Sequence, residues 1–96
     1  MAFEWDTAKN VANIAKHGID FEDAIRIFEG PVLESLDNRR EYGEVRIIAL
    51  GAVNGRELAV VYTMRGEDRR IISARRAHSR ERKAYREACP KQPPAR

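Results

Sequence analysis

Four arginines lie within one strand-like stretch, residues 69–77, and they are the first candidates for chemistry in this sequence. The middle of the stretch, from Ile71 to Ala74, is apolar or small, as a buried strand requires. A strand with a purely structural role would avoid arginine, because an unpaired buried guanidinium costs several kcal/mol. One planar guanidinium can donate hydrogen bonds to two oxygens of the same phosphate group. The stretch therefore indicates a strand that presents positive charge to a ligand.

The basic side chains are concentrated in the last third of the chain. Residues 65–96 hold eleven basic and four acidic side chains, a local excess of +7, whereas residues 1–30 hold three basic and six acidic ones. A basic surface at one end of a small domain is typical of proteins that bind nucleic acid. A solvated charged helix and tail would explain the last dozen residues, but not the arginines of the strand.

Length and composition limit the class of protein. The chain of 96 residues fits one domain, residues 1–88, with a Pro-rich tail at 89–96 that we expect to be disordered. It has neither an apolar run of about 18 residues nor an apolar signal region, which indicates a cytoplasmic protein. The single cysteine, Cys89, gives no disulfide framework. Zinc spacings and phosphate-binding glycine loops are absent from the sequence, so we expect no metal and no cofactor.

Two helices are predicted near the N-terminus, after a short extended segment at Phe3. Asp6 caps the first helix, residues 7–17, and Gly18 ends it in the left-handed conformation. Asp20 caps the second helix, which Gly30 ends. Each helix has apolar residues at helical spacing on one face: Ala8, Val11, Ala12 and Ala15 in the first, and Phe21, Ala24, Ile25 and Phe28 in the second.

The clearest local signal is Asn54-Gly55, the favoured pair for a type I′ hairpin turn, between strand-like runs at 44–53 and 56–65. The turn fixes a register in which Glu44 lies opposite Arg65 and Arg46 lies opposite Thr63. The opposite side of the hairpin is almost wholly apolar, and we assign it to the core: Val45, Ile47, Ala49, Val60, Tyr62 and Met64.

The loop after Arg65 decides which side of the next strand joins this charged group. A three-residue loop, residues 66–68, places Ser73 and Arg75 beside Arg65. A four-residue loop places Arg70 and Arg76 there instead. The shorter loop is favoured because it leaves no arginine in mid-strand facing the core.

The predicted architecture is of the α+β class. Two N-terminal helices pack on one face of a small, mostly antiparallel sheet, whose core side includes Ile72 and Ala74. A C-terminal helix capped by Ser79 closes the fold. The open face of the sheet then carries Glu44, Arg46, Arg65, Ser73 and Arg75.

A carboxylate, several guanidiniums, two histidines and tyrosines suit metal-independent cleavage of RNA. A base deprotonates the ribose 2′-OH, cations stabilise the charge that develops on the phosphate, and an acid protonates the leaving 5′-oxygen. Glu44 is a weak candidate for the base, because neighbouring arginines lower the pKa of a carboxyl group. Opposite Arg65 it also fits a surface ion pair. For Arg75, function is favoured over structure.

The remaining candidates each have two interpretations. His78 is an acid or base, or a residue that precedes the Ser79 cap. His17 and Lys16 interact with the C-terminal dipole of their helix, with RNA contact as the second interpretation. Tyr85 seals the edge of the sheet or contacts the substrate, and the first role is favoured.

The order Phe3-Glu4-Trp5-Asp6, Lys9, Asn13, Lys16-His17-Gly18-Ile19, Phe21-Glu22 and Ala24 resembles the start of a BrnT toxin. The resemblance continues through Tyr42-Gly43-Glu44 with Arg46, then 70–77, Glu81-Arg82 and Tyr85. It implies a RelE-like fold and a ribonuclease toxin of a bacterial type II toxin–antitoxin pair. It also implies a BrnA-like antitoxin, a ribbon-helix-helix protein through which the complex binds operator DNA.

The candidate site combines the reading of the residues with this resemblance. The catalytic candidates are Arg65, Arg75, Glu44, His17 and Tyr85. The RNA-binding candidates are Arg46, Ser73, Arg76, His78 and Lys16. Two other functions use the same basic face: a nucleic-acid-binding module without catalysis, and a subunit that docks an acidic antitoxin.

Overall fold

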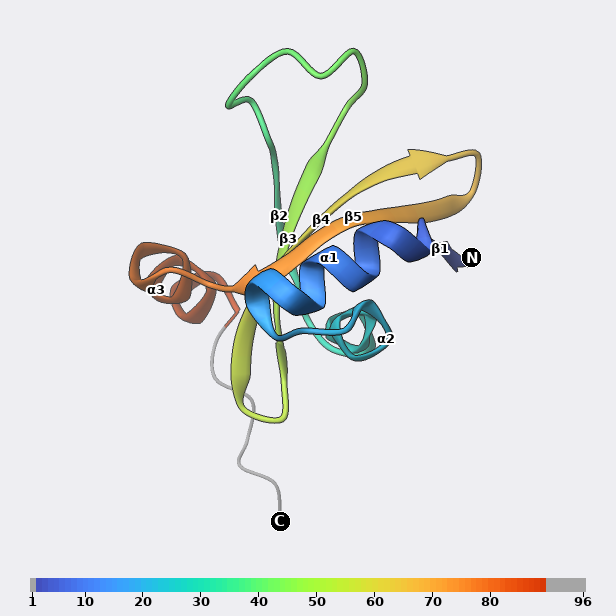
Figure 1. Ribbon diagram of the computed structural model, residues 1–96. Helices are drawn as coiled ribbons and strands as arrows, with labels where there is room; N and C mark the ends of the chain where they lie inside the picture. Colours follow the sequence, from blue (N-terminus) through green and yellow to red (C-terminus); the bar gives the residue numbers. More distant parts are fainter. Residues whose placement is uncertain (1, 90–96) are drawn as a thin grey trace.

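The computed structural model describes residues 2–89, which form a five-stranded sheet with helices around it (Figure 1). The strands are β1 (Phe3–Glu4), β2 (Leu33–Leu36), β3 (Ile47–Val53), β4 (Arg56–Arg65) and β5 (Asp68–Arg76). Their order is β1-β5-β4-β3-β2, with β1 parallel to β5 and the other neighbours antiparallel. The α+β class is therefore confirmed. The predicted tail lies, apart from Cys89, outside the described residues.

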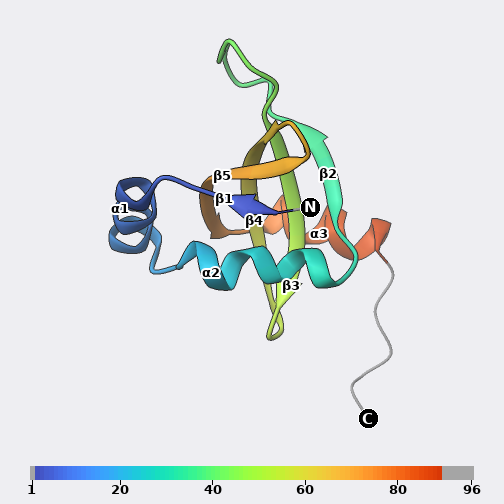
Figure 2. The ribbon, with the colours of Figure 1, turned by 90° about the vertical axis from the view of Figure 1, so that its right-hand side faces the viewer.

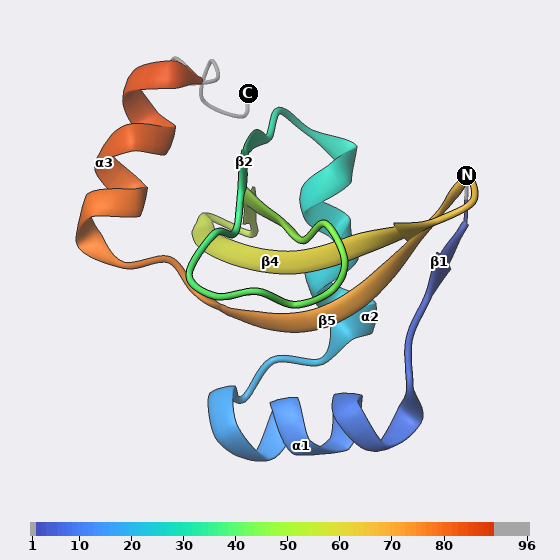
Figure 3. The ribbon, with the colours of Figure 1, turned by 90° about the horizontal axis from the view of Figure 1, so that it is seen from above.

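The helices are arranged differently from the prediction. They are α1 (Thr7–His17), α2 (Phe21–Ala24), the 3₁₀ helix η1 (Ile25–Glu29) and α3 (Ser79–Ala88). α2 and η1 cover one face of the sheet, α3 lies on the opposite face, and α1 runs along the edge beside β5 (Figures 1 and 3). None of these helices is long and apolar enough to cross a membrane.

The β3–β4 hairpin is confirmed in turn and register. Asn54 and Gly55 both have positive φ, 52° and 78°, as a type I′ turn requires. The pairing keeps the predicted register from Val53 opposite Arg56 as far as Ile47 opposite Tyr62. The prediction is wrong beyond this point, because β3 begins at Ile47 and the chain before it leaves the ladder.

The β4–β5 connection is shorter than either predicted loop. Arg65 pairs with Asp68, so the turn contains two residues, Gly66 and Glu67. A register shift then separates the pair Val61–Ser73 from the pair Tyr62–Ile71, with Ile72 between them. The bulge places both Ile71 and Ala74 in the core, whereas Ile72 was predicted there.

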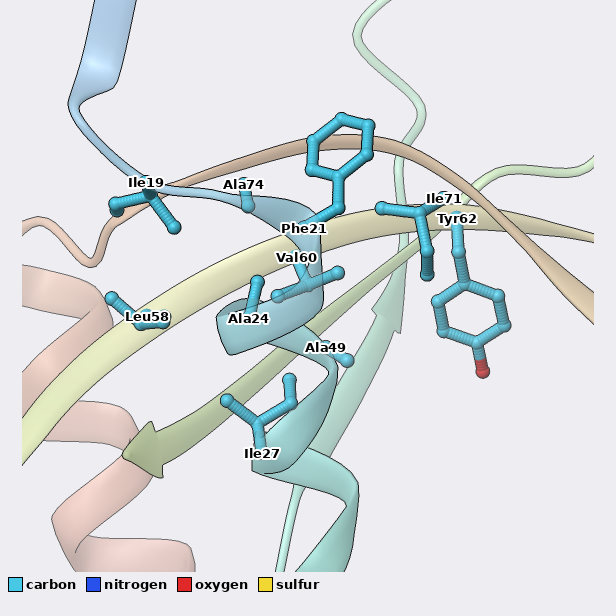
Figure 4. Packing of buried hydrophobic residues seen from close by; sticks show 10 residues of the cluster. All are labelled: Ile19, Phe21, Ala24, Ile27, Ala49, Leu58, Val60, Tyr62, Ile71 and Ala74. Carbon is cyan, nitrogen blue, oxygen red and sulfur yellow. The ribbon is translucent and has the colours of Figure 1, made fainter. Parts of the chain in front are cut away.

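The main core lies between the sheet and the segment formed by α2 and η1 (Figure 4). Phe21, Ala24 and Ile27 are fully buried and point toward the sheet. Their partners on the sheet are Ala49, Leu58, Val60, Tyr62, Ile71 and Ala74. Ala49, Val60 and Tyr62 were predicted from the hairpin register and Ala74 from the loop that follows it, whereas Leu58 and Ile71 were not predicted. The prediction fails at the far end of the hairpin, where Val45 and Met64 are exposed because no helix covers them.

The second predicted helix changes its winding partway. It begins as an α-helix capped by Asp20, whose carboxylate accepts from Glu22 N, and becomes a 3₁₀ helix at Ile25. The tighter segment passes close to β3 at Gly51. A Cβ atom on Gly51 would lie 2.6 Å from Ile27 Cβ, so glycine permits this close approach. Figure 2 shows α2 crossing in front of β3 and β4.

α1 contacts the sheet through a polar face. Asn13 is buried, and its side chain donates to Ala74 O at 2.9 Å and accepts from Ala74 N at 3.1 Å. The amide thus pairs with the β5 backbone where β1 does not extend. The predicted apolar face of α1 is real, but it is exposed, with Val11 62% accessible.

Candidate active site

Arg75 and Glu81 connect the end of β5 to the first turn of α3. The two terminal nitrogens of Arg75 donate to the two carboxylate oxygens of Glu81, at 2.8 and 2.9 Å. Glu81 also accepts from His78 N at 2.7 Å. The pair is largely shielded, with 16% of the Arg75 side chain and 23% of the Glu81 side chain exposed. The hydrogen bond from Arg75 is the main reason that the pKa of Glu81 falls to about 2.

His17 lies at the C-terminal end of α1, within electrostatic reach of Arg75. Gly18 has φ of 72° and ends the helix directly after this residue. Burial, followed by the charges of Lys16 and Arg75, lowers the pKa of His17 from its usual 6.5. A lowered pKa keeps the imidazole neutral at physiological pH, so one of its nitrogens can accept a proton.

Four other predicted residues lie near this group. Lys16 neighbours His17 and is exposed. His78 is the N-cap of α3, with its Nδ1 3.6 Å from Glu81 Oε1 and 72% of its side chain exposed. Ser73 and Arg76 belong to the same strand as Arg75. We call His17, Lys16, Arg75, His78 and Glu81 the α1–β5–α3 cluster. Its titratable groups and guanidinium suit proton transfer beside a bound anion.

Two clefts open near the α1–β5–α3 cluster. One, of about 370 Å³, lies between α3 and the β2–β3 strands and includes Arg80 and Glu81 in its wall. The other, of about 450 Å³, includes Gly18, Arg26 and Arg56. Within residues 2–89, no group of three or more His, Cys, Asp or Glu side chains is placed to hold a metal ion.

A comparison of the sequence with known protein families gives a match over most of the chain. Residues 5–81 match the family model described as ribonuclease toxin, BrnT, of type II toxin-antitoxin system. The chain belongs to the BrnT family. A search of curated proteins found no matching relative.

In this BrnT-family protein, the predicted group of Glu44, Arg46 and Arg65 does not form. Glu44 pairs with Arg46 at 3.0 Å, and the Arg46 guanidinium lies 4.0 Å from the centre of the Tyr42 ring. Arg65 is exposed at the β4–β5 turn, six positions along β4 from Ala59, the partner of Arg75. At about 3.3 Å per strand residue, Arg65 and Arg75 are roughly 20 Å apart along the strand.

Tyr85 is buried in a second, smaller core beneath α3. Its hydroxyl donates to Pro31 O at 2.9 Å, and its ring packs with Leu50, Ala59 and Ala77. Burial, followed by the nearby Cys89 and Glu57, raises the pKa of Tyr85. These contacts place Tyr85 on the face of β3 and β4 beneath α3, not at the edge of the sheet where the favoured prediction had it.

Two of the four strand arginines of this BrnT-family protein, Arg69 and Arg70, have partners in the core or on β1 and lie outside the α1–β5–α3 cluster. Arg70 forms an ion pair with Glu4 of β1 at 2.9 Å. The Arg69 guanidinium lies over the rings of Phe28, Tyr62 and Phe3, at 4.2, 5.4 and 5.7 Å. An arginine can therefore face the aromatic side of the sheet without a carboxylate partner. The functional argument from the strand now rests on Arg75 and Arg76.

Glu81 is the one member of the α1–β5–α3 cluster that was not among the site residues predicted from the sequence. A sequence signal for it exists, because His78 and Glu81 have the N-cap and N3 spacing of a capping box. We predicted Ser79 as the cap, and this is wrong: His78 has the extended backbone of the N-cap, and Ser79 is the first helical residue. The shift by one residue places Glu81 at N3, where its carboxylate reaches both the His78 N–H and Arg75.

Proposed function

We propose that this BrnT-family toxin is a metal-independent endoribonuclease whose reaction is carried out at the α1–β5–α3 cluster. RNA cleavage inhibits translation and growth in the cytoplasm until a BrnA-like ribbon-helix-helix antitoxin binds the toxin. Membership of a ribonuclease toxin family supports the reaction class. The observation that carries the site assignment is the two-point Arg75–Glu81 pair, which joins the end of β5 to the first turn of α3 next to His78. His17 of α1 lies within electrostatic reach of Arg75.

In the proposed reaction, neutral His17 takes the proton of the ribose 2′-OH. The 2′-oxygen then attacks phosphorus, and the bond to the 5′-oxygen breaks as that oxygen gains a proton. His78, exposed on the other side of Glu81, is the candidate acid. The scheme leaves Arg65, Glu44 and Arg46 as candidates for contacts with more distant parts of the RNA.

The Arg75–Glu81 pair has two opposing effects on phosphate binding. Glu81 partly cancels the charge of Arg75, which weakens its attraction for a phosphate. The same pair fixes the guanidinium, so the protein does not have to orient it during the reaction, and preorganised charge stabilises a transition state better than mobile charge. Exposed Lys16 and Arg76 add positive charge that Glu81 does not pair with. Catalysis by the cluster therefore depends on orientation more than on net charge at Arg75.

Metal independence is testable with purified protein. The described residues supply no metal-binding cluster, so we expect the protein to cut RNA in excess EDTA. Cleavage that stops with chelator and returns with magnesium would contradict the proposed reaction. No cleavage under either condition would favour the second candidate, a nucleic-acid-binding or antitoxin-binding module. The observation that favours this alternative is the two-point pairing of Arg75 with Glu81, which partly neutralises the guanidinium.

A further inference from the structure

α1 turns its polar side toward the rest of the protein and its apolar side toward solvent. At 100° per residue, Ala8, Val11, Ala12 and Ala15 fall within one sector of about 100°. Asn10, Asn13 and His17 are on the opposite side, from which Asn13 bonds to β5 and Asn10 accepts from Phe21 N of α2. The apolar sector is exposed, with Val11 accessible over 62% of its surface. Ile14, about 60° beyond Val11, is accessible over 40%. Figures 2 and 3 show α1 at the periphery of the described residues.

The charges on α1 limit what can cover this face. Lys9 and Lys16 fall within about 20° of each other, along one flank of the apolar sector. Residues 7–17 contain no acidic side chain. A partner that covers the apolar sector therefore gains electrostatic stabilisation if it carries carboxylates beside its own apolar stripe.

A second copy of the protein and the C-terminal residues 90–96 are both poor partners for the apolar sector of α1. A second copy that packed α1 against α1 would bring four lysines together with no carboxylate between them. Residues 90–96, Pro-Lys-Gln-Pro-Pro-Ala-Arg, have no acidic side chain and two basic ones. Charge complementarity thus favours a different protein.

We propose that the outer face of α1 binds an amphipathic helix of the antitoxin, whose apolar stripe contacts Val11 and whose carboxylates contact Lys9 and Lys16. This inference rests on the proposed function, since a type II toxin requires an antitoxin. The three exposed alanines, Ala8, Ala12 and Ala15, allow close approach of a second helix axis.

The position of this face connects binding to inhibition. An 11-residue helix is only about 16 Å long, too short to supply the roughly 800 Å² per partner of a stable interface. The antitoxin must therefore extend past α1. At the C-terminal end of α1 lie His17 and the α1–β5–α3 cluster, so an antitoxin that continues in this direction covers the proposed active site.

The test uses the antitoxin encoded in the same operon, purified and titrated against four forms of the toxin. Val11→Glu places a carboxylate in the centre of the apolar face. Val45→Glu is the matched control, because Val45 is equally exposed, at 65%, but lies in the loop before β3. We expect Val11→Glu to raise Kd at least tenfold and Val45→Glu to change it less than twofold. Lys9→Glu should raise Kd and reduce its dependence on salt.

Several outcomes would overturn the inference. These are an unchanged Kd for Val11→Glu, an equal loss for Val45→Glu, and no binding by the unsubstituted toxin. A concentration-dependent dimer of the toxin that Val11→Glu abolishes would instead assign the face to a second copy. Circular dichroism checks folding, and Ala8→Glu replaces Val11→Glu if that variant unfolds. RNA cleavage by each free variant is measured separately: if the unsubstituted toxin fails to cleave but Val11→Glu weakens antitoxin binding, the proposed function fails and the docking face stands.

Discussion

The Glu81 carboxylate accepts hydrogen bonds from both terminal nitrogens of Arg75, at 2.8 and 2.9 Å, and thereby links the end of β5 to the first turn of α3. The carboxylate also accepts from His78 N, so one side chain orients the guanidinium and caps the helix. Because charge-assisted hydrogen bonds in a shielded position contribute to stability, this contact both supports the fold and fixes the candidate catalytic cation.

Replacing Glu81 with Gln should lower the free energy of unfolding by about 1–3 kcal/mol, since Arg75 loses its ionic partner. RNA cleavage should also decrease, because the guanidinium is no longer fixed. Denaturant unfolding and cleavage assays measure the two effects. Glu57→Gln is the matched control, since Glu57 forms a similar two-point pair with the more exposed Arg86. Equal loss of cleavage in both variants would argue against a specific role for Glu81.

The pH dependence of this pair has a definite sign. The pKa of Glu81 is about 2 in the folded protein, against 4.5 as the ordinary value. A lowered pKa means that the unfolded state binds the proton more readily, so the stabilisation is full above pH 4.5 and is lost as the pH falls toward about 2. Glu81→Gln should flatten the stability profile in this range. A profile that stays as steep as in the unsubstituted protein would assign the acid sensitivity to other carboxylates.

His17 should titrate below its ordinary pKa of 6.5. The folded protein then binds this proton less readily than the unfolded chain, so stability rises with pH between the lowered pKa and 6.5. The fraction of neutral imidazole in the folded protein rises through the lowered pKa. NMR titration of the His17 ring gives the value directly, and the pH–rate profile should rise through the same pKa. Replacing Arg75 should raise the pKa, because one of the nearby charges is removed. A His17 pKa above 6.5 would refute the proposed base.

The hairpin and the caps of the first two helices could be predicted because their signals are local. Asn54-Gly55 fixes the neighbouring register through its own backbone conformation, and Asp6 and Gly18 mark the ends of α1. The start of β3 and the bulge at Ile72 could not be predicted this way, since both depend on how separate strands twist and pack. The predicted pairing of Glu44 with Arg65 is wrong for that reason, because Glu44 lies before the start of β3.

The inverted polarity of α1 shows a second limit. Periodicity identifies an apolar face, but does not say whether that face is buried by this chain or by another protein. The contact that decides the matter joins Asn13 to Ala74, 61 positions later. For the same reason, the sequence predicted Arg75 as a functional residue without predicting that Glu81 would pair with it.

Asn13→Ala should therefore destabilise the protein strongly, by about 2–4 kcal/mol, because it leaves the buried N–H and C=O of Ala74 without partners. Thermal unfolding measures the loss, and hydrogen exchange of the Ala74 amide should accelerate. Asn10→Ala is a useful comparison, since the Asn10 bonds to Asp20 and Phe21 N are only partly buried. A smaller loss for Asn13→Ala than for Asn10→Ala would contradict the role of Asn13 at the sheet edge.

The central claim, that Arg75 and the α1–β5–α3 cluster cleave RNA, is tested most directly by the single-turnover cleavage rate of Arg75→Ala at saturating RNA. We predict a decrease of roughly a hundredfold or more, typical of losing one preorganised stabilising group, while RNA affinity weakens only modestly. Arg65→Ala, a substitution of the same type roughly 20 Å away along β4, should mainly weaken affinity in a salt-dependent way. Arg75→Ala must remain folded by circular dichroism and still bind the antitoxin. A folded Arg75→Ala protein that cleaves RNA at the normal rate would contradict the account.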